Sequence, residues 1–215
     1  METTYIEIDS PDKHLSDVLE EIPSNVILYK TLTGIGATYS EIKAQRHSII
    51  IEPNVPVIIG KCNSDKHKND NLLGVYEGVT TDRIIKYLGA SRGKYYKILT
   101  TPESFTKVKD AFLIFNGKIY NTCFLLIDEA HKTIKDVDYR SDIVLPMNDF
   151  FKFKGKALVS ATPLKFSDPR FEENGFSIIK IEPTYDYAKE IDIKPSTNIL
   201  SLIHISEPTR LALIS

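Results

Sequence analysis

The chain has 215 residues, 42% of them hydrophobic and 26% charged, enough for one globular domain with a core. Its formal net charge of -2 gives no overall basic character, so any contact with nucleic acid must come from a local surface. Cys62 and Cys123 lie far apart without a Cys or His at ligand spacing, which argues against a disulfide framework and a structural zinc site. Without a long apolar run or a secretion signal, the sequence predicts a cytoplasmic protein with no membrane partner.

Along the chain, apolar runs alternate with amphipathic or polar segments, as in βα units built on a largely parallel sheet. Buried strands are expected at residues 26–29, 48–51, 97–100, 124–127 and 157–160. Helices are expected over 14–22, after the capping sequence at 80–82, and over 102–115. A further strand at 176–181 is interpreted as the exit from the domain. The sequence therefore predicts an α/β fold, whose ligands bind at the carboxyl ends of the strands.

The segment after the first of these strands contains two glycines and then begins a helix. A strand, a glycine-containing turn and a helix start bring backbone N–H groups and the positive end of a helix dipole to one spot, which suits phosphate. On its own, Gly34-Ile35-Gly36 is more often a tight turn, so the interpretation depends on its context. The candidate nucleotide-binding residues are Lys30, Thr33, Gly34, Gly36, Ala37 and Thr38.

Two carboxylates, Asp128 and Glu129, follow the apolar strand at 124–127, and His131 comes two residues later. Phosphoanhydride hydrolysis needs one carboxylate near Mg²⁺ and a second one that orients or deprotonates the attacking water. These three residues are therefore the candidate catalytic group. The alternative is structural: Asp128 caps the following helix and His131 is an ordinary surface residue.

Three further segments follow strands, and each carries a proline or a hydroxyl. Considered one at a time they are weak signals, because a hydroxyl and a proline after a strand are common at turns and helix starts. Their order along the chain, together with the glycine loop and the acidic segment, is more informative. The residues concerned are Pro53, Thr101, Pro102, Ser160, Ala161 and Thr162.

In this order the segments resemble the first motor domain of the superfamily 2 DEAD/DEAH-box helicases, over about residues 26–163. The resemblance implies a RecA-like P-loop NTPase domain that uses ATP and Mg²⁺. The family's phosphate loop, A/T-x-x-G-x-G-K-T, is matched at Thr31, Gly34, Gly36 and Thr38. The sequence departs from it at Ala37, where the family has the lysine that contacts the phosphates. Lys30, just before the loop, is a hypothetical substitute.

The same resemblance assigns roles to the other candidates. It implies that Asp128 and Thr38 hold the metal and that Glu129 is the general base. His131 would communicate with the third sequence motif of the family or with a second motor domain. The segments at Pro53 and at Thr101-Pro102 would contact the nucleic-acid backbone, and the segment Ser160-Ala161-Thr162 would couple nucleotide state to movement. The implied partners are DNA or RNA and a second RecA-like domain.

The main functional hypothesis is the N-terminal motor domain of an ATP-dependent DNA or RNA helicase or translocase, an ATPase whose turnover is poor without the second domain. The alternative is a catalytically weakened nucleic-acid-binding module that keeps the fold, as Ala37 would permit. A third hypothesis is a helicase subunit of a nuclease or a phage replication system. A backbone-binding path could include Lys61, Lys66, Lys68, Arg92, Lys94 and Lys97, with Tyr95 and Tyr96 stacking on bases.

The expected domain organisation has three parts. Residues 1–165 form the ATP-binding RecA-like domain, and residues 166–199 form a linker and the start of a second domain that the chain lacks. Residues 200–215 are expected to be a non-native tail, because 200–210 resemble the in-frame translation of a transposon-end adapter used in preparing sequencing libraries.

Overall fold

The computed structural model describes residues 1–31, 34–135, 144–163 and 168–186, so the expected tail and part of the expected linker lie outside the described residues. The strands are β1 (Thr3–Ile8), β2 (Val26–Lys30), β3 (His47–Ile51), β4 (Leu72–Val75), β5 (Lys97–Thr100), β6 (Cys123–Ile127), β7 (Gly155–Ser160) and β8 (Ser177–Pro183). The helices are α1 (Leu15–Val18), α2 (Ala37–Lys43), α3 (Val55–Cys62), the 3-10 helix η1 (Asp65–His67), α4 (Thr81–Ala90), α5 (Phe105–Phe115), α6 (Ile119–Thr122), α7 (Ala130–Lys135), α8 (Val144–Phe150) and α9 (Arg170–Glu173).

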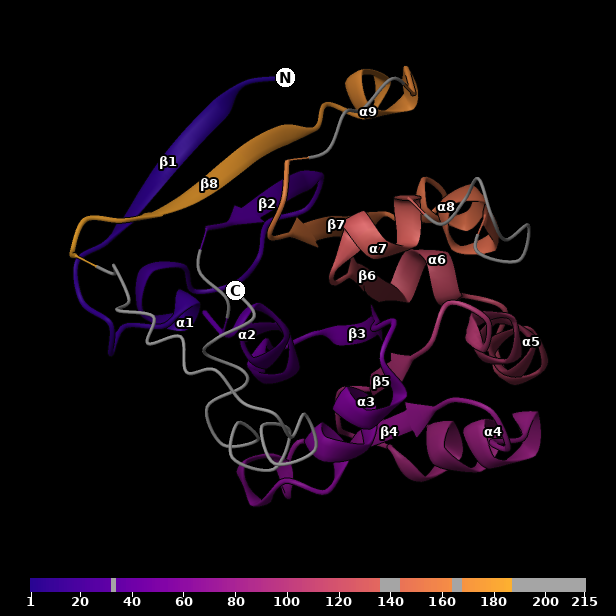
Figure 1. The fold of residues 1–215 in the computed structure, drawn as a ribbon. Coiled ribbons are helices and arrows are strands. Elements are labelled where there is room, and N and C mark those ends of the chain that lie inside the picture. Colours follow the sequence, from indigo (N-terminus) through magenta and orange to yellow (C-terminus); the bar gives the residue numbers. More distant parts are fainter. Residues whose placement is uncertain (32–33, 136–143, 164–167, 187–215) are drawn as a thin grey trace, which may run out of the picture.

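The eight strands form a single parallel sheet in the order β1-β8-β2-β7-β6-β3-β5-β4 (Figure 1). The α/β fold class is confirmed, and each of the five buried strands expected from the sequence is present. The expected helix cap is present too, since the Thr80 hydroxyl accepts a hydrogen bond from the backbone N–H of Arg83 at the start of α4. In the described part of the chain, no helix is long and apolar enough to cross a membrane.

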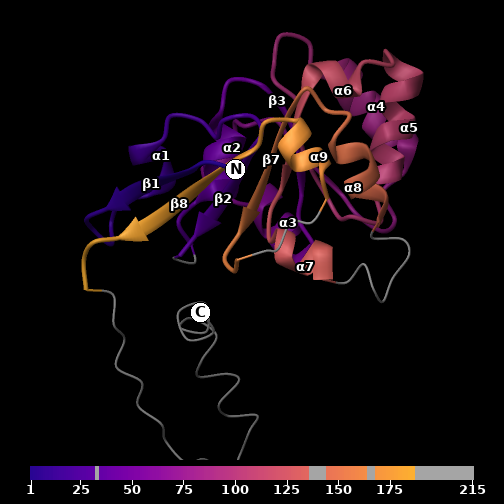
Figure 2. The ribbon, with the colours of Figure 1, turned by 90° about the horizontal axis from the view of Figure 1, so that it is seen from above.

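The strand expected at 176–181 is present as β8, but it is not the exit from the domain. It does not leave the sheet: β8 pairs with β2 on one side and with β1 on the other, and Figure 2 shows β1 and β8 side by side at one end of the molecule. Residues 177–183 therefore belong to the same sheet as residues before 165. Two expected helices are also shorter, because α1 ends at Val18 and α5 begins only at Phe105.

Both faces of the sheet are covered by helices, and each face has its own core cluster (Figure 1). Helices α1, α2 and α3 pack on one face, and α4 to α9 pack on the other. Side chains alternate between the faces along each strand, so Leu126 faces α1–α3 while Ile127 faces the larger group. Continuous apolar runs are the expected sequence of such doubly covered strands.

Two features of the topology place the site. The consecutive strands β2 and β3 are not neighbours, because β7 and β6 lie between them. In an open parallel sheet such a switch leaves a crevice at the carboxyl ends of the strands, where ligands bind. Leu28 and Leu126 both face α1–α3, so by alternation Lys30 and Asp128 are directed to the same side as α2.

Candidate functional site

Four of the predicted site residues converge at the carboxyl ends of β2 and β6. The Lys30 ammonium donates to Asp128 Oδ1 at 3.0 Å and lies 2.7 Å from Glu129 Oε1. From α2, the Thr38 hydroxyl donates to the other oxygen of Asp128, Oδ2. The strand register and the position of α2 therefore bring a lysine from the end of β2, a hydroxyl from α2 and two carboxylates from the end of the distant strand β6 together.

Lys30 and Asp128 are nearly inaccessible, at 8% and 4% exposed. Burial disfavours both charged forms, but the nearby carboxylates outweigh it and raise the pKa of Lys30 above its usual value. For Asp128, burial is likewise outweighed, by the Lys30 charge and the Thr38 hydrogen bond, so its pKa is lowered. The two residues therefore form a charged pair, each depending on the other for compensation.

The glycine loop before α2 has the backbone that its sequence requires. Gly34 and Gly36 have φ angles of 77° and 88°, in the left-handed region that glycine adopts without steric cost. The loop is fixed from the N-terminal segment, since the Leu15 N–H donates to the Ile35 carbonyl at 2.9 Å. Ala37 is 3% exposed and its methyl group belongs to the core cluster on this face. Of the candidate loop residues, Thr33 lies outside the described residues.

The acidic segment has an unusual backbone at its second carboxylate. Glu129 has a φ of 49°, a left-handed conformation that is uncommon for a residue with a side chain, and such strain is concentrated at functional sites. Its N–H donates to Asp128 Oδ1 at 2.8 Å. Its carboxylate lies 3.5 Å from Nε2 of His131, whose Nδ1 lies 3.3 Å from the Ser160 hydroxyl. His131 thus bridges the acidic segment and the end of β7.

The remaining candidates lie along the same edge of the sheet, but several are buried. Thr101 is 5% exposed, and its hydroxyl accepts a hydrogen bond from the Ser104 N–H just before α5. This is the ordinary role of a hydroxyl at a turn or helix start. Pro102 is buried and Pro53 is half-buried. The Ser160 hydroxyl donates to the Thr162 carbonyl at 2.7 Å, which shapes the turn after β7. A contact between these segments and nucleic acid stays a prediction.

The donor set at Asp128 fits Mg²⁺. Within the described ranges there is no group of three or more His, Cys, Asp or Glu side chains that could hold a metal ion. Mg²⁺ in nucleotide sites does not need such a cage, because it uses one or two carboxylates, water and phosphate oxygens. The Thr38 hydroxyl and the Asp128 carboxylate are oxygen donors in contact, and together they suit that role.

Two charged residues at the site were not among the catalytic candidates. Ile51 pairs with Ile127, so Glu52 follows β3 directly beside Asp128 at the end of β6. Burial, and then repulsion from Asp128, raise the pKa of Glu52 to about 7. On α3, burial lowers the pKa of Lys61, and the negative charges of Asp128 and Glu52 oppose this shift. The sequence signal that could have identified Glu52 as a site residue is its position directly after a predicted strand.

We expect Glu52→Gln to stabilise the protein above neutral pH. The pKa of Glu52 is raised on folding, so its favourable contribution is complete below the unfolded-state pKa and is lost as pH rises through about 7. At about pH 8 the variant should unfold with a free energy higher by about 3 kcal/mol, and near pH 4 the two proteins should agree. Urea unfolding across this range measures the difference. A gap that does not change with pH would contradict the assignment.

The proposed backbone-binding path needs a correction at two positions. Lys97 is 2% exposed and its ammonium donates three hydrogen bonds inside the protein, so it cannot line a surface path. Tyr96 stacks on His47 with ring centroids 4.2 Å apart and packs on the core. At this strand start, Tyr96 is therefore a packing residue. Tyr95 remains 45% exposed.

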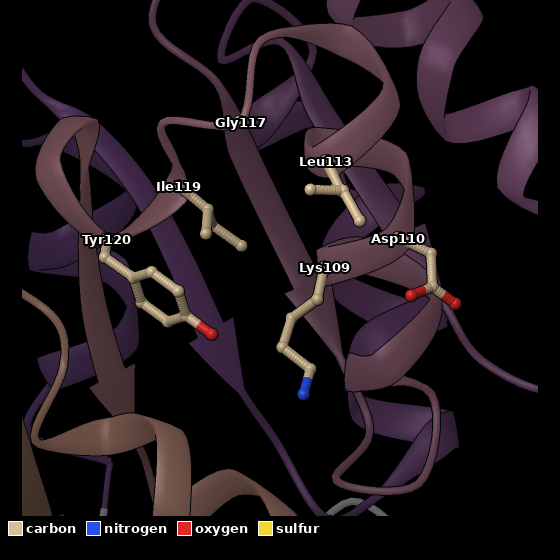
Figure 3. Close-up of a pocket in the computed structure, with 6 residues that line it drawn as sticks. All are labelled: Lys109, Asp110, Leu113, Gly117, Ile119 and Tyr120. Atoms are coloured by element: carbon tan, nitrogen blue, oxygen red, sulfur yellow. The ribbon is translucent and has the colours of Figure 1, made fainter.

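A pocket of about 240 Å³ lies elsewhere, between α5 and α6 (Figure 3). Two of its polar groups are already used within the protein, because the Lys109 ammonium and the Tyr120 hydroxyl both bind Asp149. Helix α6, which lines the pocket, directly precedes the amino end of β6, whereas Asp128 follows the carboxyl end of that strand. The pocket is therefore separate from the candidate site. Its lining residues are Lys109, Asp110, Leu113, Gly117, Ile119 and Tyr120.

Comparison with known proteins supports the fold through structure and not through sequence. No protein-family model matches the sequence, and no curated protein matches it. A hypothetical ATP-dependent RNA helicase from Sulfolobus tokodaii superimposes with a TM-score of 0.50 at 16% identity, over 73% of this chain and 48% of that one. The fold is that of a RecA-like helicase domain.

A second neighbour has the same kind of domain. The Hef helicase domain from Pyrococcus furiosus superimposes with a TM-score of 0.50 at 14% identity, over 80% of this chain and 38% of that one. This chain thus spans less than half the length of these two neighbours. At such identities the likeness is one of fold, so the RecA-like domain cannot by itself assign an activity.

Proposed function

We propose that this chain binds Mg-ATP at the carboxyl ends of β2 and β6 and is the N-terminal motor domain of an ATP-dependent DNA or RNA helicase or translocase. The observation that carries the proposal is the convergence of Lys30 and Thr38 on Asp128, with Glu129 beside them. A buried aspartate and a partly buried glutamate at the carboxyl end of a central strand, next to a glycine loop and a hydroxyl, match the needs of phosphoanhydride chemistry.

Lys30 is the best-placed residue to replace the lysine that the phosphate loop lacks at position 37. It extends from the end of β2, directly before the loop, and reaches the same carboxylate that Thr38 contacts. Ala37 packs in the core and leaves the loop without a charge of its own. A point charge near the β- and γ-phosphates needs the right location more than a particular place in the sequence. We therefore assign the phosphate-binding ammonium to Lys30.

The other residues divide the remaining work. Thr38 and Asp128 would hold Mg²⁺, which bridges phosphate oxygens and neutralises charge that develops during transfer. The Glu129 side chain is 22% exposed, with Oε2 3.5 Å from Nε2 of His131, and it would orient or deprotonate the attacking water. Through His131 and Ser160, the end of β6 is joined to the segment after β7. That connection would carry the nucleotide state toward a second domain.

We expect Mg-ATP to raise the melting temperature of the chain, and Asp128→Asn to abolish the rise. At about one hundred times the dissociation constant, binding adds about 2.7 kcal/mol, which corresponds to a shift of about 5–10 °C. Thermal unfolding with ATP, with and without Mg²⁺, measures the shift.

The matched control for that experiment is Asp149→Asn. Asp149 is as buried as Asp128, at 4% exposed, and pairs with Lys109 away from the site. This variant should lose stability yet keep the full ATP shift. A wild-type protein that ATP does not stabilise, with or without Mg²⁺, would refute the nucleotide site.

The second candidate function is a nucleic-acid-binding module that keeps the fold without hydrolysis. It is favoured by a single observation, the apolar Ala37 packed where the family's lysine would be. The ATP titration separates the two candidates, because the module needs no nucleotide. Binding of single-stranded DNA or RNA in the absence of any ATP effect would support the module.

A further inference from the structure

A buried lysine holds the far end of the helix that carries Thr38. The Lys97 ammonium, at the start of β5, donates to the carbonyls of Glu41 and Ala44, both at 2.7 Å, and to the Ser48 hydroxyl at 3.0 Å. Glu41 lies in the last turn of α2, and Ala44 directly follows the helix. A cation is favoured at this end, where the last carbonyls have no partner within the helix.

The same end of α2 is fixed by a second buried charge. The Glu41 carboxylate is fully buried, and it accepts hydrogen bonds from Arg46 Nη2 at 2.6 Å and from the Ser48 hydroxyl at 2.6 Å. The Arg46 guanidinium lies over the Phe124 ring, 3.5 Å from its centroid. This network ties α2 to β3, β5 and β6, the strands whose other ends carry Glu52, Thr101 and Asp128.

We propose that Lys97 is a positioning residue for nucleotide binding: by anchoring the carboxyl end of α2, it keeps Thr38 against Asp128. The inference rests on the proposed nucleotide site. Helix α2 has only seven residues, with Thr38 in its first turn and the Lys97 contacts at its end. So short a helix moves as one body, and releasing its end displaces the hydroxyl that contacts Asp128.

The chain contains a matched control for this role. Lys156 in β7 is also buried, at 3% exposed, and donates to the Phe153 carbonyl and to Asn174 Oδ1, both at 3.1 Å. These acceptors lie outside α2 and away from the phosphate loop. Lys156→Met therefore removes a buried, hydrogen-bonded ammonium from the same sheet without releasing α2.

The test compares the affinity of folded Lys97→Met and Lys156→Met for a fluorescent ATP analogue with Mg²⁺, at low temperature and with folding checked by circular dichroism. We expect Lys97→Met to weaken binding by about tenfold, the equivalent of one lost charged hydrogen bond, and Lys156→Met to leave it within about twofold. An unchanged affinity in Lys97→Met, or equal weakening in both variants, would overturn the positioning role. If the wild-type protein binds no nucleotide, the proposed function fails as well.

The pH dependence of the wild-type protein is a second readout that does not require the variant to fold. Burial lowers the pKa of Lys97 to about 8, so nucleotide affinity should fall as pH rises through that value. The charged groups around Lys97 are Glu41, Arg46, Asp70, Glu21 and His47. The pKa of His47 is lowered from 6.5, chiefly by burial, so it titrates below this range. An affinity that does not fall between about pH 7.5 and 9 would contradict the proposal. A folded Lys97→Met should lack the fall near pH 8 and keep only the change near pH 7 that comes from Glu52.

Discussion

Lys30→Met should lower the free energy of unfolding by about 4 kcal/mol at neutral pH. This loss is typical of proteins in which one partner of a buried ion pair is removed. The reason is the environment of Asp128, which is 4% exposed and whose lowered pKa depends on the Lys30 charge. In the variant, Asp128 either remains charged without compensation or takes up a proton. Chemical unfolding in urea measures the loss, and ATP should no longer stabilise the protein.

A double-mutant cycle separates this effect from lost packing. Lys30→Met combined with Asp128→Asn removes both charges, and most of the stability should return because a neutral pair needs no compensation. The matched control is Lys132→Met, because its ammonium lies 3.7 Å from Glu129 on a side chain that is 46% exposed. Removing this exposed partner should change stability by less than about 1 kcal/mol. A Lys30→Met protein as stable as the Lys132→Met protein would show that the buried pair does not compensate Asp128.

The sequence predicts most of the central sheet because these strands are buried on both faces. A run such as 124–127 is apolar at every position, which distinguishes it from the segments around it. The outer strands lack this signal. β1 is an edge strand whose side chains are mostly exposed or partly buried, and β4 is a four-residue edge strand that contains Gly74. The place of β8 depends on pairing with residues far away in the chain, which local pattern cannot supply.

The residues of the candidate site were likewise only partly predictable from the sequence. The sequence could name Lys30, Thr38 and Asp128 because each stands next to a strand or glycine signal, and the structure brings these three into contact. It could not predict that Lys97 is an internal anchor. A lysine at the start of a strand is usually solvated, and only the packing of α2 brings two backbone carbonyls to its ammonium. The contribution of Glu52 likewise depends on the register between β3 and β6.

Helix α5 provides the second large effect, in the core of the face opposite α2. Phe112 is fully buried and meets Tyr96 edge-on, with ring centroids 6.0 Å apart, so Phe112→Ala should cost about 4 kcal/mol through lost burial and a cavity. Phe115, one turn later, is 38% exposed, and Phe115→Ala should cost less than about 1 kcal/mol. Urea unfolding of both variants measures the contrast. Because neither ring touches α2, the folded variants should bind ATP alike, and equal losses of stability would mean that α5 does not pack as described.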